Sequence, residues 1–189
     1  MKKTNQRGLV IFVEGPDDKR FCERIIQPRC NKYKSVQIRR HASLPTKQIV
    51  NEIKFVKSRN YDYAFVVDIN DEPCVTSKKQ KKEQEIGGLD SSKIIVVIKE
   101  IESWYLAGLD DTNCKKFGIP SPNHTNTTTK EMFNDRFKPR LSKKGHFPDT
   151  LERRRLLGEI LDCFDEETAL SKNDSFDYFL RKFCNEDSA

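Results

Sequence analysis

Residues 8–18 read GLVIFVEGPDD, and this stretch decides the fold. The run over 9–13 is continuously apolar, which is typical of a strand buried on both faces of a parallel sheet. Pro16 then suits the first position of a helix, because its missing N–H would have no partner there. Asp17 and Asp18 follow in the first turn, where acids complement the helix dipole. The stretch therefore predicts a buried strand, a turn and a helix.

Strands and helices continue to alternate up to about residue 108. Further strands are expected at 35–39, where polar and apolar residues alternate, and at 63–67 and 93–98. Helices are expected after Pro45 and over 100–107, where Gly108 ends the helix, with a lysine-rich helix or mobile loop at 76–86. This alternation predicts an α/β fold, a Rossmann-like parallel sheet flanked by helices. Ligands of such sheets bind outside the carboxyl ends of the strands.

The remainder of the chain has a different character. Residues 109–150 are rich in proline, asparagine and threonine and are expected to be irregular, with helices following at about 151–163 and 174–184. We therefore predict an α/β domain over 1–110. Residues 111–189 are expected to form an irregular basic segment and a small helical appendage packed on the same domain.

Composition limits the class of protein. A hydrophobic fraction of 35% with 12 Phe is too apolar for a disordered chain of 189 residues. No apolar run approaches the roughly 20 residues that span a bilayer, and the basic N-terminus lacks a signal-peptide pattern. The six cysteines form no C-x-x-C pair. We expect a cytoplasmic protein with no membrane partner, whose cysteines are reduced thiols rather than zinc ligands or a disulfide framework.

Positive charge is concentrated in one segment, 115–158, called here the basic block. It holds eleven Lys and Arg against four Asp and Glu, an excess of seven positive charges within a chain of net charge +6. Such a patch suits a polyanion such as nucleic acid, although a solvated charged surface is the alternative. The candidate nucleic-acid contacts are Lys138, Arg140, Lys143, Lys144, Arg153, Arg154 and Arg155.

Acidic residues follow three of the predicted strands. Glu14 follows the first strand, Asp68 ends the third, and Glu100 and Glu102 follow the fourth. Because parallel strands bring their carboxyl ends to one edge, these acids are expected to converge there. A divalent cation would offset their repulsion, and oxygen donors suit Mg²⁺ or Mn²⁺.

Neighbouring residues extend this candidate site. Asn70 and Asp71 add oxygen donors close to Asp68, although Asp71 is also typical of a turn before Pro73. Lys99 adjoins the acids and is a candidate for contacting a phosphate, with a salt-bridged lysine as the alternative. One acid after a strand is ordinary, because polar residues begin there. Three strand ends together are more specific.

Four segments of the chain resemble a known family. Residues 13–18, VEGPDD, resemble the strand end that opens Toprim domains, and residues 66–70, VVDIN, resemble their second motif. Residues 100–106, EIESWYL, resemble a segment of small stand-alone bacterial Toprim-like proteins related to OLD-family nucleases. Residues 176–180, FDYFL, resemble their C-terminal ending. The resemblance covers the sheet domain and, more loosely, the tail.

The resemblance implies a Toprim-like fold and a hydrolase, namely a Mg²⁺- or Mn²⁺-dependent nuclease. Glu14 would act as general base or acid or as a metal ligand, and Asp68 would be the principal ligand. Glu100 or Glu102 would complete a second metal position. The implied partners are nucleic acid and a protein of a defence or repair system. Asn70 stands where the family usually has aspartate, so a catalytically degenerate binding module is the alternative.

A third interpretation is a phosphoacceptor domain of the response-regulator kind, with Asp68 as the acceptor. That fold usually has paired acids after its first strand and a lysine at the end of its fifth. Only Glu14 directly follows the first strand here, and no clear fifth strand is present. We rank this interpretation last.

Overall fold

The computed structural model describes residues 7–138 and 151–185 of the chain. Contacts divide the chain into two units, Met1–Val97 with Tyr178–Ala189, and Ile98–Asp177. The division between Val97 and Ile98 lies earlier than the expected boundary at residue 110, and the last segment of the chain belongs to the first unit. Each unit is described by itself.

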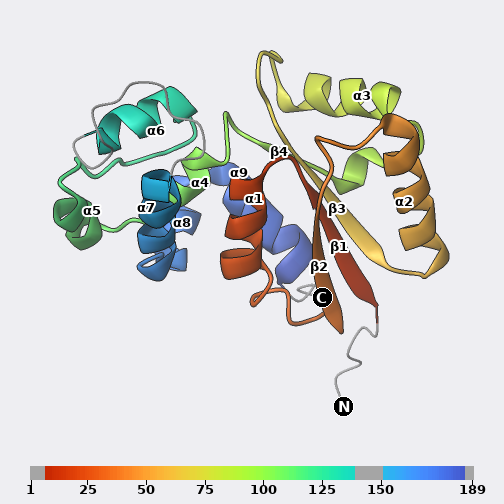
Figure 1. Cartoon of the computed structure of the whole chain (residues 1–189), viewed down its shortest axis with the longest axis horizontal. Helices are drawn as coiled ribbons and strands as arrows, with labels where there is room; N and C mark the ends of the chain where they lie inside the picture. The colour runs from red at the N-terminus through yellow and green to blue at the C-terminus, as the bar shows by residue number, and fades with distance from the viewer. Residues whose placement is uncertain (1–6, 139–150, 186–189) are drawn as a thin grey trace. The chain divides into compact units, whose positions relative to one another are not determined.

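The first unit is built on a four-stranded, all-parallel sheet with the order β2-β1-β3-β4. Its strands are β1 (Gly8–Val13), β2 (Ser35–Arg40), β3 (Asp62–Asp68) and β4 (Ile94–Val97). Helices flank this sheet, with α1 on one side and α2 and α3 on the other (Figure 1). The predicted Rossmann-like α/β class is confirmed, and every expected strand is present.

Burial explains the order of the strands. Every residue of β1 is buried, as the continuous apolar run predicts for a central strand, whereas β2 at the edge alternates between half-buried and exposed. One face of the sheet packs against the helix α2 (Thr46–Ser58). The shared core contains Val10, Phe12, Phe65 and Val67 from the strands and Ile49, Ile53 and Val56 from the helix.

The helices next to the carboxyl ends of the strands follow local signals. The helix α1 (Pro16–Phe21) has proline in its first turn, and the Asp18 carboxylate accepts a hydrogen bond of 3.2 Å from the Gly15 N–H. It continues as a π-helical turn, η1 (Cys22–Ile26). The lysine-rich segment forms a helix, α3 (Val75–Glu85), rather than a loop. The acids of the first turn therefore serve the helix, as expected.

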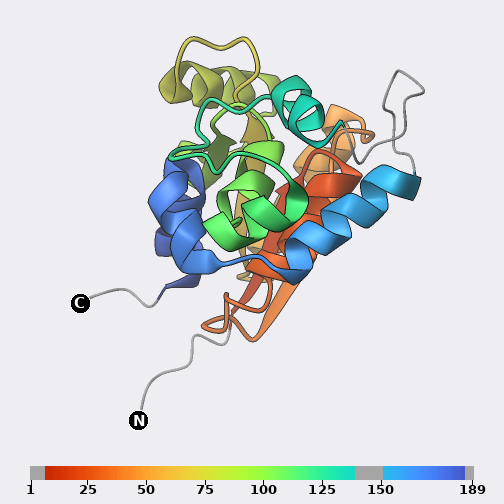
Figure 2. The ribbon, with the colours of Figure 1, turned by 90° about the vertical axis from the view of Figure 1, so that its left-hand side faces the viewer.

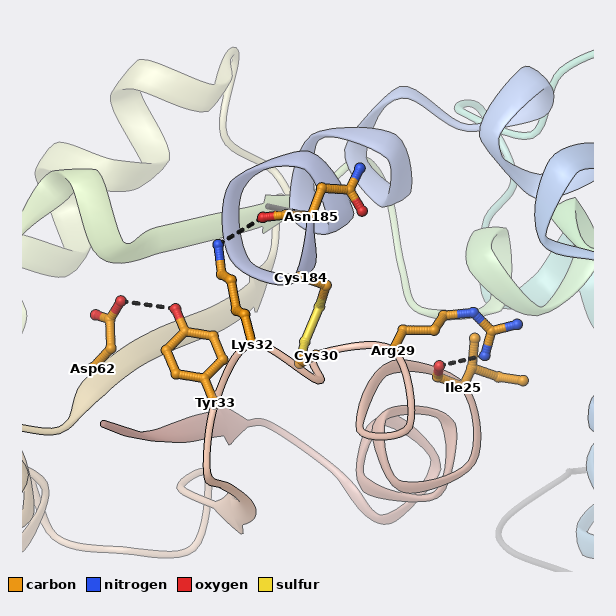
Figure 3. The surroundings of a disulfide bond; sticks show 8 residues. All are labelled: Ile25, Arg29, Cys30, Lys32, Tyr33, Asp62, Cys184 and Asn185. Atoms are coloured by element: carbon orange, nitrogen blue, oxygen red, sulfur yellow. Dashed lines mark hydrogen bonds between the residues drawn. A yellow bond between two sulfur atoms is a disulfide. The ribbon is translucent and has the colours of Figure 1, made fainter. Parts of the chain in front are cut away.

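The C-terminal segment of the first unit forms a π-helical turn, η3 (Leu180–Cys184), and is tied back covalently. Figure 3 shows the disulfide between Cys184 and Cys30, two buried residues 154 positions apart. Nearby, the Lys32 ammonium donates a hydrogen bond of 2.8 Å to the Asn185 carbonyl. The expectation that the cysteines are all reduced thiols is wrong for this pair.

We predict that replacing both bonded cysteines, as Cys30→Ala/Cys184→Ala, lowers the free energy of unfolding by about 2–4 kcal/mol. The bond closes a long loop and so restricts the unfolded chain. Urea unfolding with and without dithiothreitol measures the loss. Reductant should lower the stability of the wild type by the same amount, and it should leave the stability of the variant unchanged. Equal stability of the wild type under both conditions would exclude the bond. Cys74→Ala, at an exposed free thiol, is the control.

The second unit surrounds one short buried helix, α4 (Glu102–Ala107). The helices α6 (Lys130–Phe137), α7 (Leu151–Asp162) and α8 (Glu166–Lys172) contact it (Figure 2). Gly108 follows α4, as predicted, and a Cβ atom there would collide with the ring of Phe164. Glycine is therefore required at this position by close packing.

The segment 109–150, expected to be irregular, contains two helices among its described residues. They are α5 (Asp111–Phe117) and α6, and side chains of Asp110 and Thr129 cap their N-termini. The sequence pattern does not indicate α8, whereas α7 matches the expected helix at 151–163. The helix α9 (Asp174–Phe179), followed by η3, matches the one expected at 174–184. Short capped helices with few apolar residues lack the periodicity on which prediction depends.

Buried hydrogen bonds hold the second unit together around Asn173. Its side-chain N–H groups donate to Ser103 and Thr125, at 3.2 and 3.0 Å, and its carbonyl oxygen accepts from Ser175 at 2.8 Å. The indole N–H of Trp104 donates to the same Ser175 hydroxyl at 2.8 Å. These bonds satisfy polar groups that would otherwise be costly to bury.

Within the described residues, no helix has the length and apolar character to cross a membrane.

Candidate functional site at the carboxyl edge of the sheet

The strand order creates a topological switch point in the first unit. The chain leaves β1 for β2 on one side and then crosses to β3 on the other, so β1 and β3 are adjacent but their connections diverge. In open parallel sheets, ligands bind outside the carboxyl ends of the strands at such a point. Glu14 follows β1, and Asp68 ends β3. The two acids therefore come from adjacent strand ends.

A cavity of about 500 Å³ opens next to β1 at this edge. Its wall combines carboxylate, amide, imidazole and ammonium groups with apolar side chains from α2 and from the segments that precede α2 and follow α3. The lining residues are Glu14, His41, Ala42, Leu44, Thr46, Ile49, Asn70, Lys82, Glu85 and Ile86. The cavity thus brings together two of the residues expected at the site, Glu14 and Asn70.

Asp68 is half-buried at the end of β3 but does not line this cavity. Its neighbour Val67 packs in the core on the α2 face, and side chains alternate along a strand, so Asp68 starts from the opposite face. Among the described residues, no group of three or more His, Cys, Asp or Glu is arranged to hold a metal ion. Glu14 and Asp68 therefore follow adjacent strands, but the described residues do not form a closed set of carboxylate ligands around one point.

Two residues beyond strand ends adopt the left-handed backbone conformation. Asn70, two residues after β3, has φ 51°, and Lys99, two residues after β4, has φ 68°. Asparagine tolerates this conformation better than most residues, which gives Asn70 a backbone role besides its amide. Lys99 belongs to the second unit and is exposed.

The acids after Asn70 have local partners or face solvent. Glu72 accepts hydrogen bonds from Ser77 at 2.7 Å and Lys81 at 2.6 Å, and these contacts, led by the Lys81 one, lower the pKa of its carboxyl. Asp71 is exposed. Glu72 therefore stabilises the start of α3, in agreement with a turn role for this segment.

The acids after β4 lie in the second unit and are engaged there. The Glu100 carboxylate accepts a hydrogen bond from the Lys130 N–H, at the start of α6. Glu102 is buried in an ion pair, with 2.7 Å between its Oε1 and a guanidinium nitrogen of Arg153. Burial raises the pKa of the Glu102 carboxyl, while the nearby guanidinium opposes that shift. As placed, Glu102 binds an arginine rather than standing open as a metal ligand.

The same pair corrects one expected nucleic-acid contact. Arg153 is only 2% exposed, donates at 2.6 Å to the Asn134 side chain and lies over the ring of Phe133. It is an internal residue of the second unit. Lys138, Arg154 and Arg155 are exposed, and Arg155 pairs with Glu159 at 3.0 Å. The other candidates, Arg140, Lys143 and Lys144, lie outside the described residues.

Sequence reasoning missed three residues of the first unit at this edge, His41, Lys78 and Lys82. His41 follows β2, its ring stacks on Phe65 with centroids 4.3 Å apart, and its Nε2 lies 3.4 Å from the Val66 carbonyl. Lys82 lines the cavity, and Lys78 precedes it by one turn of α3. An isolated histidine and lysines in a lysine-rich helix carry no motif, so no sequence signal marked them.

His41 should make the protein sensitive to acid. Burial lowers the pKa of its imidazole from 6.5 to about 4, because the charged form loses hydration. Above pH 6.5 the ring is neutral in both the folded and the unfolded state. As pH drops from 6.5 towards 4, the unfolded state binds a proton that the folded state does not, so the free energy of unfolding should fall. This loss amounts to about 3 kcal/mol.

Urea unfolding of the wild type and His41→Phe at pH 7 and pH 4.5 measures this contribution. The variant keeps a ring against Phe65 but cannot take up a proton, so its loss of stability on acidification should be smaller. His124→Gln, at an exposed histidine, should behave as the wild type. Identical acid sensitivity of His41→Phe and the wild type would show that His41 does not contribute.

Comparisons with known proteins identify no family: no family model, no curated protein and no solved structure matches the chain. The fold class and the geometry of the strand ends are therefore the basis for assigning a function.

Proposed function

We propose that the chain is a Mg²⁺- or Mn²⁺-dependent phosphodiesterase that acts on nucleic acid. The observation that supports this most directly is the position of Glu14 and Asp68, which follow adjacent parallel strands at the topological switch point. A site at this place is where the fold class holds its ligands. The Toprim resemblance, carried by the same two residues, is consistent with it.

The available donors suit a hard cation. Glu14 and Asp68 offer carboxylate oxygens, and Asn70 offers an amide oxygen beside Glu14 in the cavity wall. Mg²⁺ commonly uses only one or two protein carboxylates and completes its shell with water and substrate phosphates, so a closed protein cage is not required. When bound, the cation would stabilise negative charge on the phosphoryl group and lower the pKa of a bound water.

The chain's own residues have distinct roles in this proposal. Glu14 is half-buried at the rim of the cavity, where it can accept or deliver a proton at the phosphate or hold the cation. Asp68, rigidly placed by β3, is the principal ligand. Asn70 orients the edge of the site through its left-handed turn and its amide oxygen. A rigid strand end positions such groups better than a loop does.

The nucleic-acid backbone is assigned to exposed cations of the basic block. Among the described residues these include Lys138, Arg154 and Arg155. Contacts of this kind bind phosphates without reading sequence and release counterions, so affinity should fall as salt concentration rises. Arg153 is excluded from this set by its burial.

Comparing the wild type with Asn70→Asp tests the proposal. Cleavage of single- and double-stranded DNA and RNA is measured over a Mg²⁺ and Mn²⁺ series. Aspartate also tolerates the left-handed backbone, so the exchange adds a carboxylate with little strain. We expect cleavage by the wild type at high Mn²⁺ first, and cleavage by Asn70→Asp at lower metal concentration. Absence of cleavage in both forms on every substrate would contradict the proposed activity.

A binding module without catalysis is the second candidate, and Asn70 is the observation that favours it. The asparagine removes one negative charge from the expected pair of acids, and a hard dication binds less tightly to fewer charges. A degenerate site would keep salt-dependent binding of nucleic acid but show no cleavage. Binding without cleavage in both forms of the Asn70→Asp experiment would therefore support this candidate.

A further inference from the structure

Lys78 in α3 is an unusual residue because its side chain is buried, with 4% of the residue exposed. Lysine is almost never fully buried unless it is paired, since an ammonium group is strongly hydrated in water. The other lysines named on this helix differ from it: the side chain of Lys81 is 55% exposed and that of Lys82 is 21% exposed.

The charges around Lys78 do not compensate its burial. Burial lowers the pKa of its ammonium, the charge of Lys82 lowers it further, and Glu14 and Glu72 partly oppose this. Glu72 is bonded to Ser77 and Lys81 instead. Among the residues that the structure describes, no carboxylate is in ion-pair contact with Lys78. The side chain of Lys78 is thus buried, and its ammonium has no carboxylate bonded to it among the described residues.

The position of this cation connects it with the candidate site. Lys78 and Lys82 are four residues apart and therefore share one face of α3. Lys82 lines the 500 Å³ cavity together with Glu14 and Asn70, and its ammonium lies 2.7 Å from the Glu85 carboxylate. Lys78 is not among the residues that line the cavity, but the charge of Glu14 acts on its ammonium and raises its pKa.

We propose that Lys78 and Lys82 form a phosphate subsite beside Glu14. An anion bound there would provide the partner that Lys78 lacks, and the two ammonium groups can hold it as charge-assisted hydrogen-bond donors. The phosphate is a phosphodiester of nucleic acid, an identification that rests on the proposed function. Binding of phosphate itself does not rest on it. Lysine binds phosphate as a point charge and so accepts different orientations of the group.

The matched variants are Lys78→Met and Lys81→Met, which remove a buried and an exposed ammonium from the same helix. Binding is measured by calorimetry in EDTA with inorganic phosphate, then with a dinucleotide that carries only an internal phosphodiester. Lys78→Met should lower the affinity for both ligands about 10-fold or more, which is the effect of losing one charged hydrogen bond. Lys81→Met should remain within about 2-fold. Weakening of inorganic phosphate alone would overturn the phosphodiester assignment.

Melting temperature without ligand separates a binding role from a structural one. A lysine kept for binding is a burden to the fold, so Lys78→Met should melt at the same or a higher temperature than the wild type. A lower melting temperature with unchanged phosphate affinity would overturn the proposal and assign Lys78 to the fold. Lys82→Met provides a second test, because its partly exposed side chain can be removed without disturbing the core.

The outcome is independent of catalysis. All binding is measured without a divalent cation, so the subsite can be present in a protein that cleaves nothing. Conversely, cleavage by a wild type that binds neither phosphate nor dinucleotide in EDTA would support the proposed function and overturn the subsite.

Discussion

Arg153→Met is expected to lower the free energy of unfolding of the protein by about 3–5 kcal/mol. The substitution leaves the Glu102 carboxylate buried without its partner, 2.7 Å from where the guanidinium had been. It also removes the hydrogen bond to Asn134 and the contact with Phe133. An uncompensated buried charge is among the few causes of so large a loss. Urea unfolding monitored by the fluorescence of Trp104 measures it.

The double variant Glu102→Leu/Arg153→Met is the informative control. Replacing both charges by apolar groups removes the uncompensated charge, so stability should return to near the wild-type value or exceed it. Arg155 lies two residues after Arg153 in α7, and Arg155→Met breaks only the exposed contact with Glu159. This variant should lower the free energy of unfolding by less than about 1 kcal/mol. A loss below 1 kcal/mol for Arg153→Met would contradict a buried pair.

Glu14→Gln is expected to reduce phosphodiesterase kcat/KM by about 10²–10⁴-fold. Glutamine has nearly the shape of glutamate but can neither take up a proton nor bring a negative charge to a cation. Since Glu14 is half-buried at the cavity rim, the exchange should leave the melting temperature almost unchanged. Cleavage of a fluorescent oligonucleotide at saturating Mn²⁺ provides the rate.

Glu72→Gln is the matched control for this loss. Glu72 also lies at the carboxyl edge of the sheet, but its carboxylate is occupied by Ser77 and Lys81 at the start of α3. Its exchange should alter cleavage by less than about 3-fold, because screened surface pairs contribute little. Equal losses in the two variants, or none in Glu14→Gln, would remove Glu14 from the reaction.

Local sequence patterns predict the strands correctly because the signal for each strand lies within its own residues. The apolar run over 9–13 indicated a strand buried on both faces, and the alternation over 35–39 indicated a second, weaker strand. Pro16 and Gly108 marked a helix start and a helix end. These features depend on neighbours in sequence, which is the information that periodicity and capping rules use.

The features that prediction missed depend on distant partners. Nothing near Cys30 in the sequence indicates Cys184, because pairing requires the C-terminal segment to return to the first unit. Arg153 belongs to a run of three arginines that looks solvent-exposed, and only packing of α7 on α4 turns it towards Glu102. Lys78 is hidden in the same way within a lysine-rich helix. The acids that follow the strands can be identified from the sequence. Their division between two faces of the sheet and between the two units cannot.

We propose that the edge formed by Glu14 and Asp68 binds a divalent cation, and one measurement tests this most directly. The melting temperature is recorded for the wild type and Asp68→Ala over a Mn²⁺ titration in the absence of nucleic acid. A cation at 100 times its dissociation constant stabilises the folded state by about 2.7 kcal/mol. We expect a clear rise in melting temperature for the wild type and none for Asp68→Ala. A wild type that shows no rise in millimolar Mn²⁺, or an equal rise in Asp68→Ala, would contradict the claim.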